Sequence, residues 1–431
     1  MAVLESGRRN IVILGAGFGG ITALLKLYRG LERNSLQHRY HLVLVNRNAY
    51  HLYTPALYEI AAIPKGAADS ARLKTSICIP IDDILEHLPG VRFVGEIADA
   101  LDPERHIITF ASGDQLNFEY LIIALGAETN FFGIPGMAER ALPMKTFEDA
   151  LHLRNRVEEL IRATTGNFCV LVAGGGATGV ELSAELVNFL CYVKKRMAAG
   201  KCQEEITLIE ASPEILPGFS HEVIKRVRRR LRKLGVFIRA GTRIREVRAT
   251  DVLLDTGVSL PYHILIWAGG VRPPSVLKNF GLPLTDQGNI ATNEFLEARA
   301  ETGAPATRVA LASGRIYAIG DNAHFIHPKT GQPVAGSVPV AEAGARLAAK
   351  NIIAEIIGQR KKIFRPAVQY PFILALGGKY AVTDLIVVKF FGFAGWFLKQ
   401  LVELRYLLFI LPWQKAVITW FRTVHYSLKN D

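Results

Sequence analysis

The 431-residue sequence has few cysteines and no long uninterrupted run of apolar residues. Its four cysteines, Cys78, Cys169, Cys191 and Cys202, show no CxxC spacing. The absence of CxxC spacing argues against a disulfide framework and against a dithiol redox pair. It favours a reducing compartment. Residues 1–10 contain no apolar segment of signal-peptide length, so we expect no export. The sequence also lacks the stretch of about 18 apolar residues that a transmembrane helix requires.

The composition is that of a large folded protein. Half of the residues are apolar and the mean hydropathy is +0.20, which excludes intrinsic disorder. A chain of this length is too long for one hydrophobic core, so we expect two or three domains. The formal net charge of +12 fits a nucleic acid, an anionic substrate or an anionic membrane surface as partner. Composition alone does not choose among these three.

Two glycine-rich turns, each between a hydrophobic strand and a helix, are the most informative features. The first contains Gly15, Ala16, Gly17, Phe18, Gly19 and Gly20, and the second contains Gly174, Gly176 and Gly179. In a GxGxxG turn the first glycine permits a tight reversal, the second lets the backbone approach a pyrophosphate, and the third lets helix and strand pack closely. The diphosphate lies at the helix N-terminus, where free N–H groups favour negative charge. Two such turns predict two dinucleotides, an arrangement suited to electron transfer.

Strands and helices alternate around both turns, which indicates a parallel sheet in each unit. The predicted elements are strands at 11–14, 40–45, 206–210 and 315–321, and helices at about 18–30, 146–163 and 178–199. We therefore expect an α/β protein with two Rossmann-like dinucleotide-binding domains, the second inserted in the first. The expected boundaries are 8–140 and 273–358 for the first dinucleotide-binding domain, 141–272 for the second, inserted domain and 359–431 for a separate C-terminal region.

The C-terminal region differs in composition from the rest. Three of the four tryptophans lie within residues 385–426, among many phenylalanines and leucines. Lys389, Lys399, Glu403 and Arg405 interrupt this apolar sequence. Cations spaced among aromatics are typical of amphipathic helices that lie in a lipid interface. A dimerisation or core segment remains the alternative interpretation.

Polar residues at strand ends distinguish the two nucleotide sites. Asn46 and Arg47 follow the second strand, where Asn46 can hydrogen-bond a ribose hydroxyl. Asp321 ends a later strand, where its carboxylate can accept hydrogen bonds from a flavin's ribityl hydroxyls. Glu210 ends the corresponding strand of the second unit, and a carboxylate there accepts from ribose hydroxyls and repels a 2′-phosphate. The sequence thus favours a flavin in the first site and NADH over NADPH in the second.

Three further features have competing interpretations. Glu181, in the first turn of the second nucleotide-binding helix, is a candidate for proton transfer near a flavin or simply a charge favourable at a helix N-terminus. The run 225–233 carries seven cations in nine residues, which indicates a solvated helix face, ahead of membrane steering. It lacks the interleaved aromatics that nucleic-acid binding favours. The histidines form no metal-ligand pattern, so we predict no metal site.

Together these residues resemble type II NADH dehydrogenase, the single-subunit NADH:quinone oxidoreductase, over nearly the whole chain. The matching segments are Gly15–Gly20, Asn48–Pro55, Ala124–Asn130, Gly174–Glu181, Trp267–Arg272 and Ile319–Asp321. The resemblance implies FAD in the first site, NADH as substrate in the second, and a quinone (menaquinone or ubiquinone) that reaches the flavin from the membrane side. It also places Glu181 on the family's active-site glutamate and assigns Ala98 backbone contacts to the FAD adenine.

One segment departs from this family's pattern. Members often carry an AQxxxQQG motif beside the quinone pocket, whereas Ser337–Gly344 has Val338, Glu342 and Ala343 in place of the three glutamines. An amide can donate a hydrogen bond to a quinone carbonyl, but a carboxyl group can do so only when protonated. We predict that Ser337 and Val338 contact the bound groups and that Glu342 is a second candidate acid beside Glu181.

The sequence therefore predicts a peripheral flavoenzyme on the cytoplasmic face of the cell membrane that does not pump ions and binds no nucleic acid. A homodimer is left open. Three alternatives are considered: a sulfide:quinone oxidoreductase, which needs paired cysteines at the flavin; a soluble NADH-dependent flavin reductase of a protein carrier; and a membrane-associated protein that binds NADH and FAD with little turnover.

Overall fold

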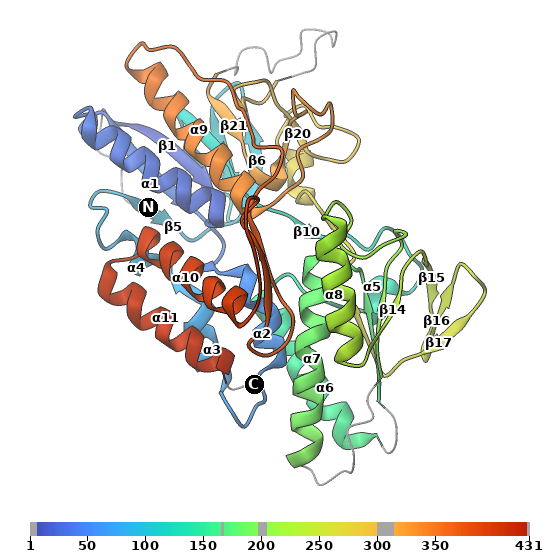
Figure 1. The fold of residues 1–431 in the computed structure, drawn as a ribbon. Coiled ribbons are helices and arrows are strands. Elements are labelled where there is room, and N and C mark those ends of the chain that lie inside the picture. The colour runs from blue at the N-terminus through green and yellow to red at the C-terminus, as the bar shows by residue number, and fades with distance from the viewer. Residues whose placement is uncertain (1–6, 165–167, 197–204, 300–313, 429–431) are drawn as a thin grey trace.

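Two five-stranded parallel sheets dominate the computed structural model, which describes residues 7–164, 168–196, 205–299 and 314–428 (Figure 1). The first sheet consists, in spatial order, of β21 (Ile316–Ala318), β9 (Tyr120–Ile123), β1 (Arg9–Leu14), β2 (Tyr40–Val45) and β5 (Arg92–Val94). The second consists of β11 (Leu142–Pro143), β18 (Ile264–Trp267), β12 (Cys169–Ala173), β13 (Glu205–Ile209) and β14 (Val236–Arg239).

Apolar strands covered on both faces account for these parallel sheets. Residues 11–14 of β1 are fully buried, as expected for a strand with helices or loops on both sides. β21 pairs with β9 in parallel, although all strands of the second sheet lie between β9 and β21 in the sequence. The predicted α/β fold, with a second Rossmann-like unit inserted in the first, is confirmed. The numerical domain boundaries stay predictions.

Helices cover the sheets and begin at the glycine turns. In the first unit α1 (Phe18–Arg33) packs against α9 (Val338–Ile356), and a Cβ atom placed on Gly30 of α1 would lie 2.7 Å from Cγ1 of Ile353. The second unit contains α6 (Phe147–Ala163), α7 (Ala177–Arg196) and α8 (His221–Lys233). The predicted helix at 178–199 agrees with α7, except that residues 197–199 lie outside the described part.

Smaller elements join these layers. The short helices are α2 (Leu57–Ala62), α3 (Ser70–Ile77), α4 (Ile81–Leu85) and α5 (Met137–Arg140). The short antiparallel sheets are formed by β3 (Tyr50–Leu52) and β4 (Cys78–Pro80); by β6 (Ala98–Asp102), β7 (Ile107–Phe110) and β8 (Gln115–Asn117); by β10 (Glu128–Thr129) and β19 (Val271–Arg272); and by β15 (Ile244–Val247), β16 (Asp251–Leu254) and β17 (Ser259–Pro261). β20 (Ile290–Ala291) pairs in parallel with β22 (Ala323–His324).

The C-terminal region is a three-stranded antiparallel sheet followed by two helices. Its elements are β23 (Phe372–Ala375), β24 (Ala381–Asp384), β25 (Lys389–Gly392), α10 (Phe393–Ile410) and α11 (Trp413–Ser427). One side of α10 is part of the protein core, because Tyr406, Leu407 and Ile410 are buried in the same cluster as the inward residues of α1. The interpretation as a core segment therefore holds for this side of α10, and the membrane interpretation stays a prediction.

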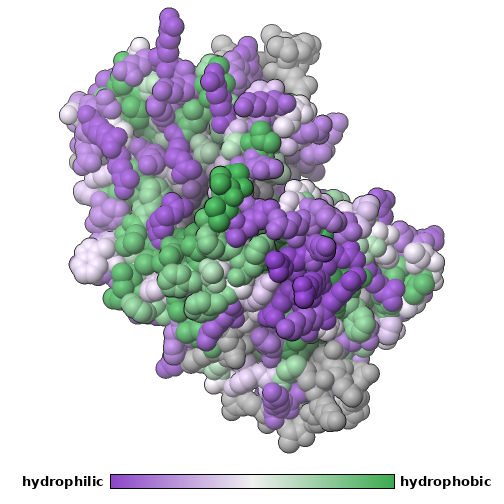
Figure 2. All heavy atoms as spheres, in the orientation of Figure 1, coloured by the Kyte–Doolittle hydropathy of each residue, from purple (hydrophilic) through white to green (hydrophobic). Residues whose placement is uncertain are grey.

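The opposite side of the two helices is an apolar surface. Its exposed side chains are Phe393, Phe397, Leu401, Val402, Leu408, Trp413, Ile418 and Phe421. Figure 2 shows the resulting hydrophobic patch on the face of the molecule where α10 and α11 lie. Of the helices that the structure describes, none is both long enough and apolar enough to cross a membrane.

The cysteines require one correction. The expectation of a chain without disulfides is wrong for Cys191, which is disulfide-bonded in α7. Cys78 and Cys169 are free thiols, and Cys202 lies outside the described residues. The absence of CxxC spacing excludes a closely spaced redox pair, but it says nothing about cysteines that folding brings together.

The double role of α10 predicts unequal effects of truncating its two faces. Ile410→Ala should lower the free energy of unfolding by about 2–5 kcal/mol, because it removes a fully buried side chain from the core. Phe397→Ala, at a side chain that is 50% exposed, should change it by about 0.5 kcal/mol or less. Urea unfolding of the full-length protein measures both variants. Equal losses would contradict the assignment of the two faces.

Candidate active site

The first glycine turn is closed on one side by the backbone and open on the other. Gly15 has φ of +102°, and a Cβ atom there would lie 2.3 Å from the carbonyl oxygen of Ala124. A Cβ atom on Gly20 would lie 1.8 Å from the carbonyl oxygen of Gly15. Gly17 is exposed, and its Cβ position has nothing within 4 Å. Since Gly17 caps α1 without a side-chain hydrogen bond, the first N–H groups of the helix stay available to a ligand.

The second turn repeats this geometry. Gly174 has φ of +113° and its Cβ position lies 2.4 Å from the carbonyl oxygen of Ala268, while that of Gly179 lies 1.9 Å from the carbonyl oxygen of Gly174. Gly176 is again open, with nothing within 4 Å. The two turns therefore share three positions where glycine has a physical reason: a left-handed reversal, a close helix–strand contact and an open approach to the backbone.

The strand-end residues Asn46 and Glu210 hydrogen-bond to the backbone of these turns. Asn46 Oδ1 accepts a hydrogen bond from the Ala16 N–H at 3.1 Å, and its Nδ2 donates to the Asn48 carbonyl at 2.8 Å. Glu210 accepts from the N–H groups of Gly175 and Ser212, each at 2.6 Å. Sequence reasoning expected Asn46 and Glu210 to meet ribose hydroxyls but missed this bracing. An oxygen acceptor with two lone pairs can serve both purposes.

Arg47 and Ala98 lie near the same strand ends. The Asn46 N–H donates to the carbonyl of Val94, the last residue of β5, at 3.1 Å. Ala98 follows as the first residue of β6 and is buried. Arg47 is exposed. These residues thus surround the end of the first sheet that lies beside the first glycine turn.

Asp321 lies in a 3₁₀ turn (Gly320–Asn322) after β21. A Cβ atom on Gly336 would lie 1.9 Å from Asp321 Oδ1, so only glycine fits against this carboxylate. The neighbouring Asn322 is fully buried and donates from Nδ2 to the Gly126 carbonyl at 2.7 Å. Its Oδ1 has no partner in the described part of the chain. Sequence reasoning missed Asn322. The available signal was an amide residue directly after Asp321, the predicted flavin ligand.

Glu181 lies where the C-terminal sheet meets α7. Its Oε1 accepts a hydrogen bond at 3.2 Å from the N–H of Ala375, the last residue of β23. Burial raises the pKa of Glu181 to about 8, because an ionised carboxylate loses hydration there. Near neutral pH this carboxyl group therefore holds a proton that it can donate.

Further acids and one lysine surround Glu181. Lys399 of α10 donates a hydrogen bond to Glu59 of α2, and both side chains are largely buried. Lys399 also lowers the pKa of Glu181, although burial outweighs this effect. Burial raises the pKa of Glu403 to about 7, with Lys399 opposing it. The seam between α2, α7 and α10 thus holds two carboxyl groups, Glu181 and Glu403, whose protonation changes near neutral pH.

An aromatic cluster surrounds Tyr406 of α10. Phe18, His51 and Tyr53 each have a ring centroid within 6 Å of that of Tyr406, at 4.8, 5.7 and 5.7 Å. Burial raises the pKa of Tyr53, with Glu181 among the acids that add to it. Burial likewise raises the pKa of Tyr406, with Glu342 adding to it. Glu181 thus acts electrostatically on Tyr53 and Glu342 on Tyr406, and of this cluster sequence reasoning selected only Phe18 as a site residue.

The start of α9 places the remaining predicted residues. Ser337 is exposed just before the helix, and Val338 is its partly buried first residue. Glu342 forms a salt bridge with Arg346 at 3.1 Å. Ser337 also lines a groove with a volume of ≈ 290 Å³, together with His327, Thr330, Val340 and Tyr370.

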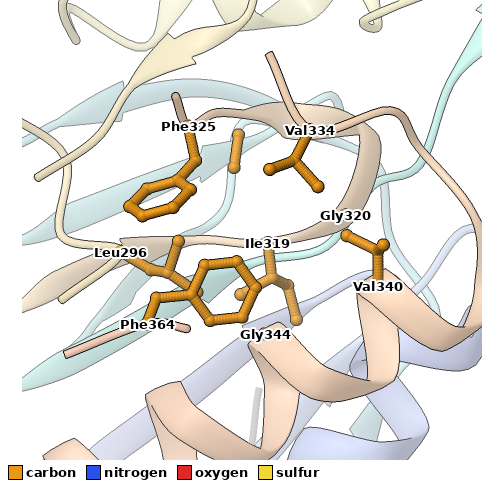
Figure 3. Close-up of a pocket in the computed structure, with 9 residues that line it drawn as sticks. Leu296, Ile319, Gly320, Phe325, Val334, Val340, Gly344 and Phe364 are labelled. Atoms are coloured by element: carbon orange, nitrogen blue, oxygen red, sulfur yellow. The ribbon is translucent and has the colours of Figure 1, made fainter. Parts of the chain in front are cut away.

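A smaller cavity of ≈ 20 Å³ lies beneath this segment (Figure 3). Figure 3 shows Phe325, Phe364, Leu296 and Val340 around it, and all of them are apolar. The volume suits at most a water molecule, and the lining offers it few hydrogen bonds. We therefore assign no ligand to this cavity. Among the described residues, no group of three His, Cys, Asp or Glu is arranged to hold a metal ion.

Known proteins are similar to this chain in sequence and in fold. A demethylphylloquinone reductase from Synechocystis is 28% identical over 93% of each chain, and a type II NADH:quinone oxidoreductase from Haemophilus influenzae is 26% identical over 83% of each. The structure of NDH2 from Plasmodium falciparum in complex with NADH superposes with a TM-score of 0.79 at 19% identity, covering 97% of both chains.

The family itself follows from a longer match. The family model for pyridine nucleotide-disulphide oxidoreductases covers residues 9–345, which include both glycine turns and both sheets. Because this match spans well over half of the sequence, the chain belongs to the pyridine nucleotide-disulphide oxidoreductase family.

Proposed function

We propose that this protein oxidises NADH through a bound FAD and delivers the electrons to a quinone. The observation that carries the proposal is the position of Glu181, on the helix that begins at the second glycine turn and beside the aromatic cluster that contacts the first. Relatives named as quinone reductases support the choice of acceptor. The residues fit two nucleotides and one proton-consuming acceptor.

The first turn fits the diphosphate of FAD. Gly17 leaves open backbone there, and the uncapped N–H groups of α1 favour phosphate oxygens. Asp321 would accept from the ribityl chain, the unpartnered Oδ1 of Asn322 adds a buried acceptor nearby, and Asn46 would meet the ribose. Arg47, Ala98, Ser337 and Val338 complete the proposed set. When bound, FAD supplies the capacity to accept a hydride from NADH and to pass two electrons onward.

The second turn fits NADH. Gly176 opens the backbone to the diphosphate, and Glu210 lies beneath the turn with both carboxylate oxygens close to it. A negative group at this position disfavours the 2′-phosphate of NADPH. Hydride transfer needs no acid or base from the protein, so the task of this site is to bind and orient the nicotinamide.

The acids between the turns serve the acceptor. Reduction of a quinone to a quinol consumes two protons. Glu181 holds one of them near neutral pH. The buried Glu403 lies in the same seam and has a pKa raised to about 7. Glu342, paired with Arg346, is the second proposed acid of the pocket. The Tyr53 and Tyr406 rings supply the flat apolar surface that a quinone ring would contact.

The cysteine positions do not favour a sulfide:quinone oxidoreductase. Cys169 begins β12, whereas the glycine turn follows the opposite end of that strand. Cys78 is buried in β4, and burial raises the pKa of its thiol to about 12, which disfavours the reactive thiolate. The two free thiols therefore form no pair beside the proposed flavin.

Anaerobic NADH titration tests the redox proposal. We expect the oxidised-flavin absorbance of the purified protein to bleach with one equivalent of NADH and to recover when a short-chain quinone is added. Bleaching that only a protein carrier reverses would support the flavin reductase alternative. A flavin that NADH does not bleach would support the low-turnover binding protein. Either result would overturn the quinone assignment.

The raised pKa of Glu181 predicts an alkaline limb in the quinone-reduction rate. The proton is present below about pH 8 and lost above it, so the rate should fall as pH rises through that value. Glu181→Gln should lower the rate about 10²-fold and abolish the limb. Glu185→Gln, one helical turn further along, should keep the limb but move it to lower pH, because Glu185 helps to raise the pKa of Glu181. An unchanged limb in Glu181→Gln would sink this role.

We also propose that the apolar face of α10 and α11 rests on an anionic membrane surface. The hairpin between β24 and β25 extends this face, with Val387 90% exposed at its tip. Beside it, α8 presents five exposed cations, which are Lys225, Arg226, Arg229, Arg232 and Lys233. The guanidinium of Arg226 lies 4.4 Å from the Phe391 ring centroid, so α8 and β25 are in direct contact.

Figure 2 shows this contiguity on one face, where the hydrophilic patch over α8 borders the hydrophobic patch. Apolar side chains can enter the interface while the adjacent cations meet anionic headgroups. The cytoplasmic leaflet and a homodimer stay predictions. A second copy of the chain on the same apolar face is the competing occupant.

Surface substitutions test the membrane proposal better than truncation, because α10 also supplies core residues. Val387→Asp should weaken binding to vesicles of phosphatidylglycerol and phosphatidylcholine. The Arg229→Glu, Lys233→Glu double variant should weaken it by about tenfold or more, and only when phosphatidylglycerol is present. Arg243→Glu, Arg245→Glu makes the same charge change near β15 and should bind normally. Unaltered vesicle binding in all three, with Val387→Asp breaking a dimer in sedimentation, would favour the second copy.

A further inference from the structure

His51 links the C-terminal helix to the first glycine turn through two hydrogen bonds. It lies in β3 and is fully buried. Its Nδ1 lies 2.7 Å from the carbonyl oxygen of Ala16, and its Nε2 lies 2.9 Å from the hydroxyl oxygen of Tyr406. Ala16 and Tyr406 are 390 positions apart in sequence numbering (406 − 16). The imidazole ring of His51 thus bridges Ala16 and Tyr406 through hydrogen bonds.

The partners fix the direction of both bonds. A backbone carbonyl only accepts hydrogen bonds, so Nδ1 of His51 carries the hydrogen. Burial lowers the pKa of His51 to about 4, which keeps the ring neutral and leaves Nε2 as an acceptor. The Tyr406 hydroxyl must therefore donate, and burial raises its pKa so that it keeps its proton. The order is Tyr406 O–H to His51 Nε2, then His51 Nδ1–H to Ala16 carbonyl.

The same bonds hold the Ala16 residue on both sides. Its N–H donates to Asn46 Oδ1 at 3.1 Å, while its carbonyl accepts from His51. Rotation of the peptide between Ala16 and Gly17 would break the bond to His51. That peptide carries the N–H of Gly17, the residue at which the turn is open.

The surroundings of the His51 ring are mainly aromatic. Phe18 packs edge-on against the His51 ring with centroids 5.1 Å apart, and Tyr406 is tilted over Phe18 at 4.8 Å. Tyr53 lies beside both Phe18 and Tyr406. Glu342 is the charged group that acts on Tyr406. A buried acceptor that loses its donor here is left unsatisfied, and the ring is then held by hydrogen bonding on the Ala16 side alone.

We propose that Tyr406 and His51 are positioning residues for the FAD diphosphate, so that the C-terminal helix α10 sets how tightly the first glycine turn holds its cofactor. The inference rests on the proposed FAD in that turn. It gives α10 a role besides membrane contact, because one of its core-facing side chains fixes the orientation of a backbone N–H in the nucleotide site. Removal of the C-terminal region should consequently release flavin as well as abolish membrane binding.

Release of FAD from the full-length holoprotein tests this role. Tyr406→Phe removes one oxygen atom and should speed FAD dissociation about tenfold, measured as the rise in free-flavin fluorescence after dilution. Tyr317→Phe is the matched control, since its hydroxyl is also fully buried and donates to Glu297 at 3.3 Å. It should cost similar thermal stability without a change in FAD release. Equal release rates in the two variants would overturn the proposal.

A spectroscopic measurement keeps the test independent of stability. In ¹⁵N-histidine-labelled holoprotein, His51 should show a protonated Nδ1 and an unprotonated Nε2, and Tyr406→Phe should move the Nε2 resonance toward that of an acceptor without a hydrogen-bond donor. A wild-type His51 with the hydrogen on Nε2 would also overturn the proposal. Fast FAD release by Tyr406→Phe in a protein that reduces no quinone would support the positioning role while the proposed function fails. Normal FAD release by Tyr406→Phe in a protein that reduces quinone would support the proposed function and overturn the positioning role.

Discussion

Close approach of backbone to backbone at the two glycine turns is the constraint on which the rest of the structure depends. At Gly20 and Gly179 a methyl group would overlap a carbonyl oxygen of the same turn at 1.8 and 1.9 Å. Each contact lets a helix start directly above its strand, which leaves the N–H groups of the helix pointing out of the sheet edge. Asn46 and Glu210 then fix each turn from beneath through its amide hydrogens. The nucleotide sites are therefore backbone sites, and side chains serve mainly to hold the backbone in place.

A seam of desolvated acids forms where the inserted unit and the C-terminal region meet. Burial favours the neutral form of Glu181 and Glu403, while the Lys399 ammonium favours the charged form. Burial outweighs the lysine at both positions, so the two pKa values lie close to neutrality. Such groups suit a reaction that takes up protons inside a protein, because their cost of ionisation is already small near the working pH. The Tyr53 and Tyr406 ring centroids lie 5.7 Å apart, and Glu181 and Glu403 both act electrostatically on Tyr53.

Much of the fold and part of the site could be predicted because the signals are local. The runs before Gly15 and Gly174 are apolar over four residues, and the predicted strand at 40–45 agrees with β2 to the residue. Glu181 and Glu342 could be selected as acids, yet not their relation, since Tyr53 and Tyr406 come from distant segments. The disulfide of Cys191 and the pairing of Tyr406 with His51 have no local signature either. The sequence did not show that α10 has one buried and one exposed apolar face. It offered only the choice between a lipid-interface helix and a dimerisation or core segment.

The two nucleotide turns, the α/β alternation and the apolar, cation-spaced C-terminal region can all be recognised without the structure. These depend on chain geometry within a few residues, namely which positions tolerate a positive φ and which side chains recur with helical or strand period. Only the tertiary structure decided which acids are desolvated, which tyrosine meets His51 and which face of α10 enters the core. Those properties depend on the distance between residues far apart in the chain and on the water that packing removes from between them.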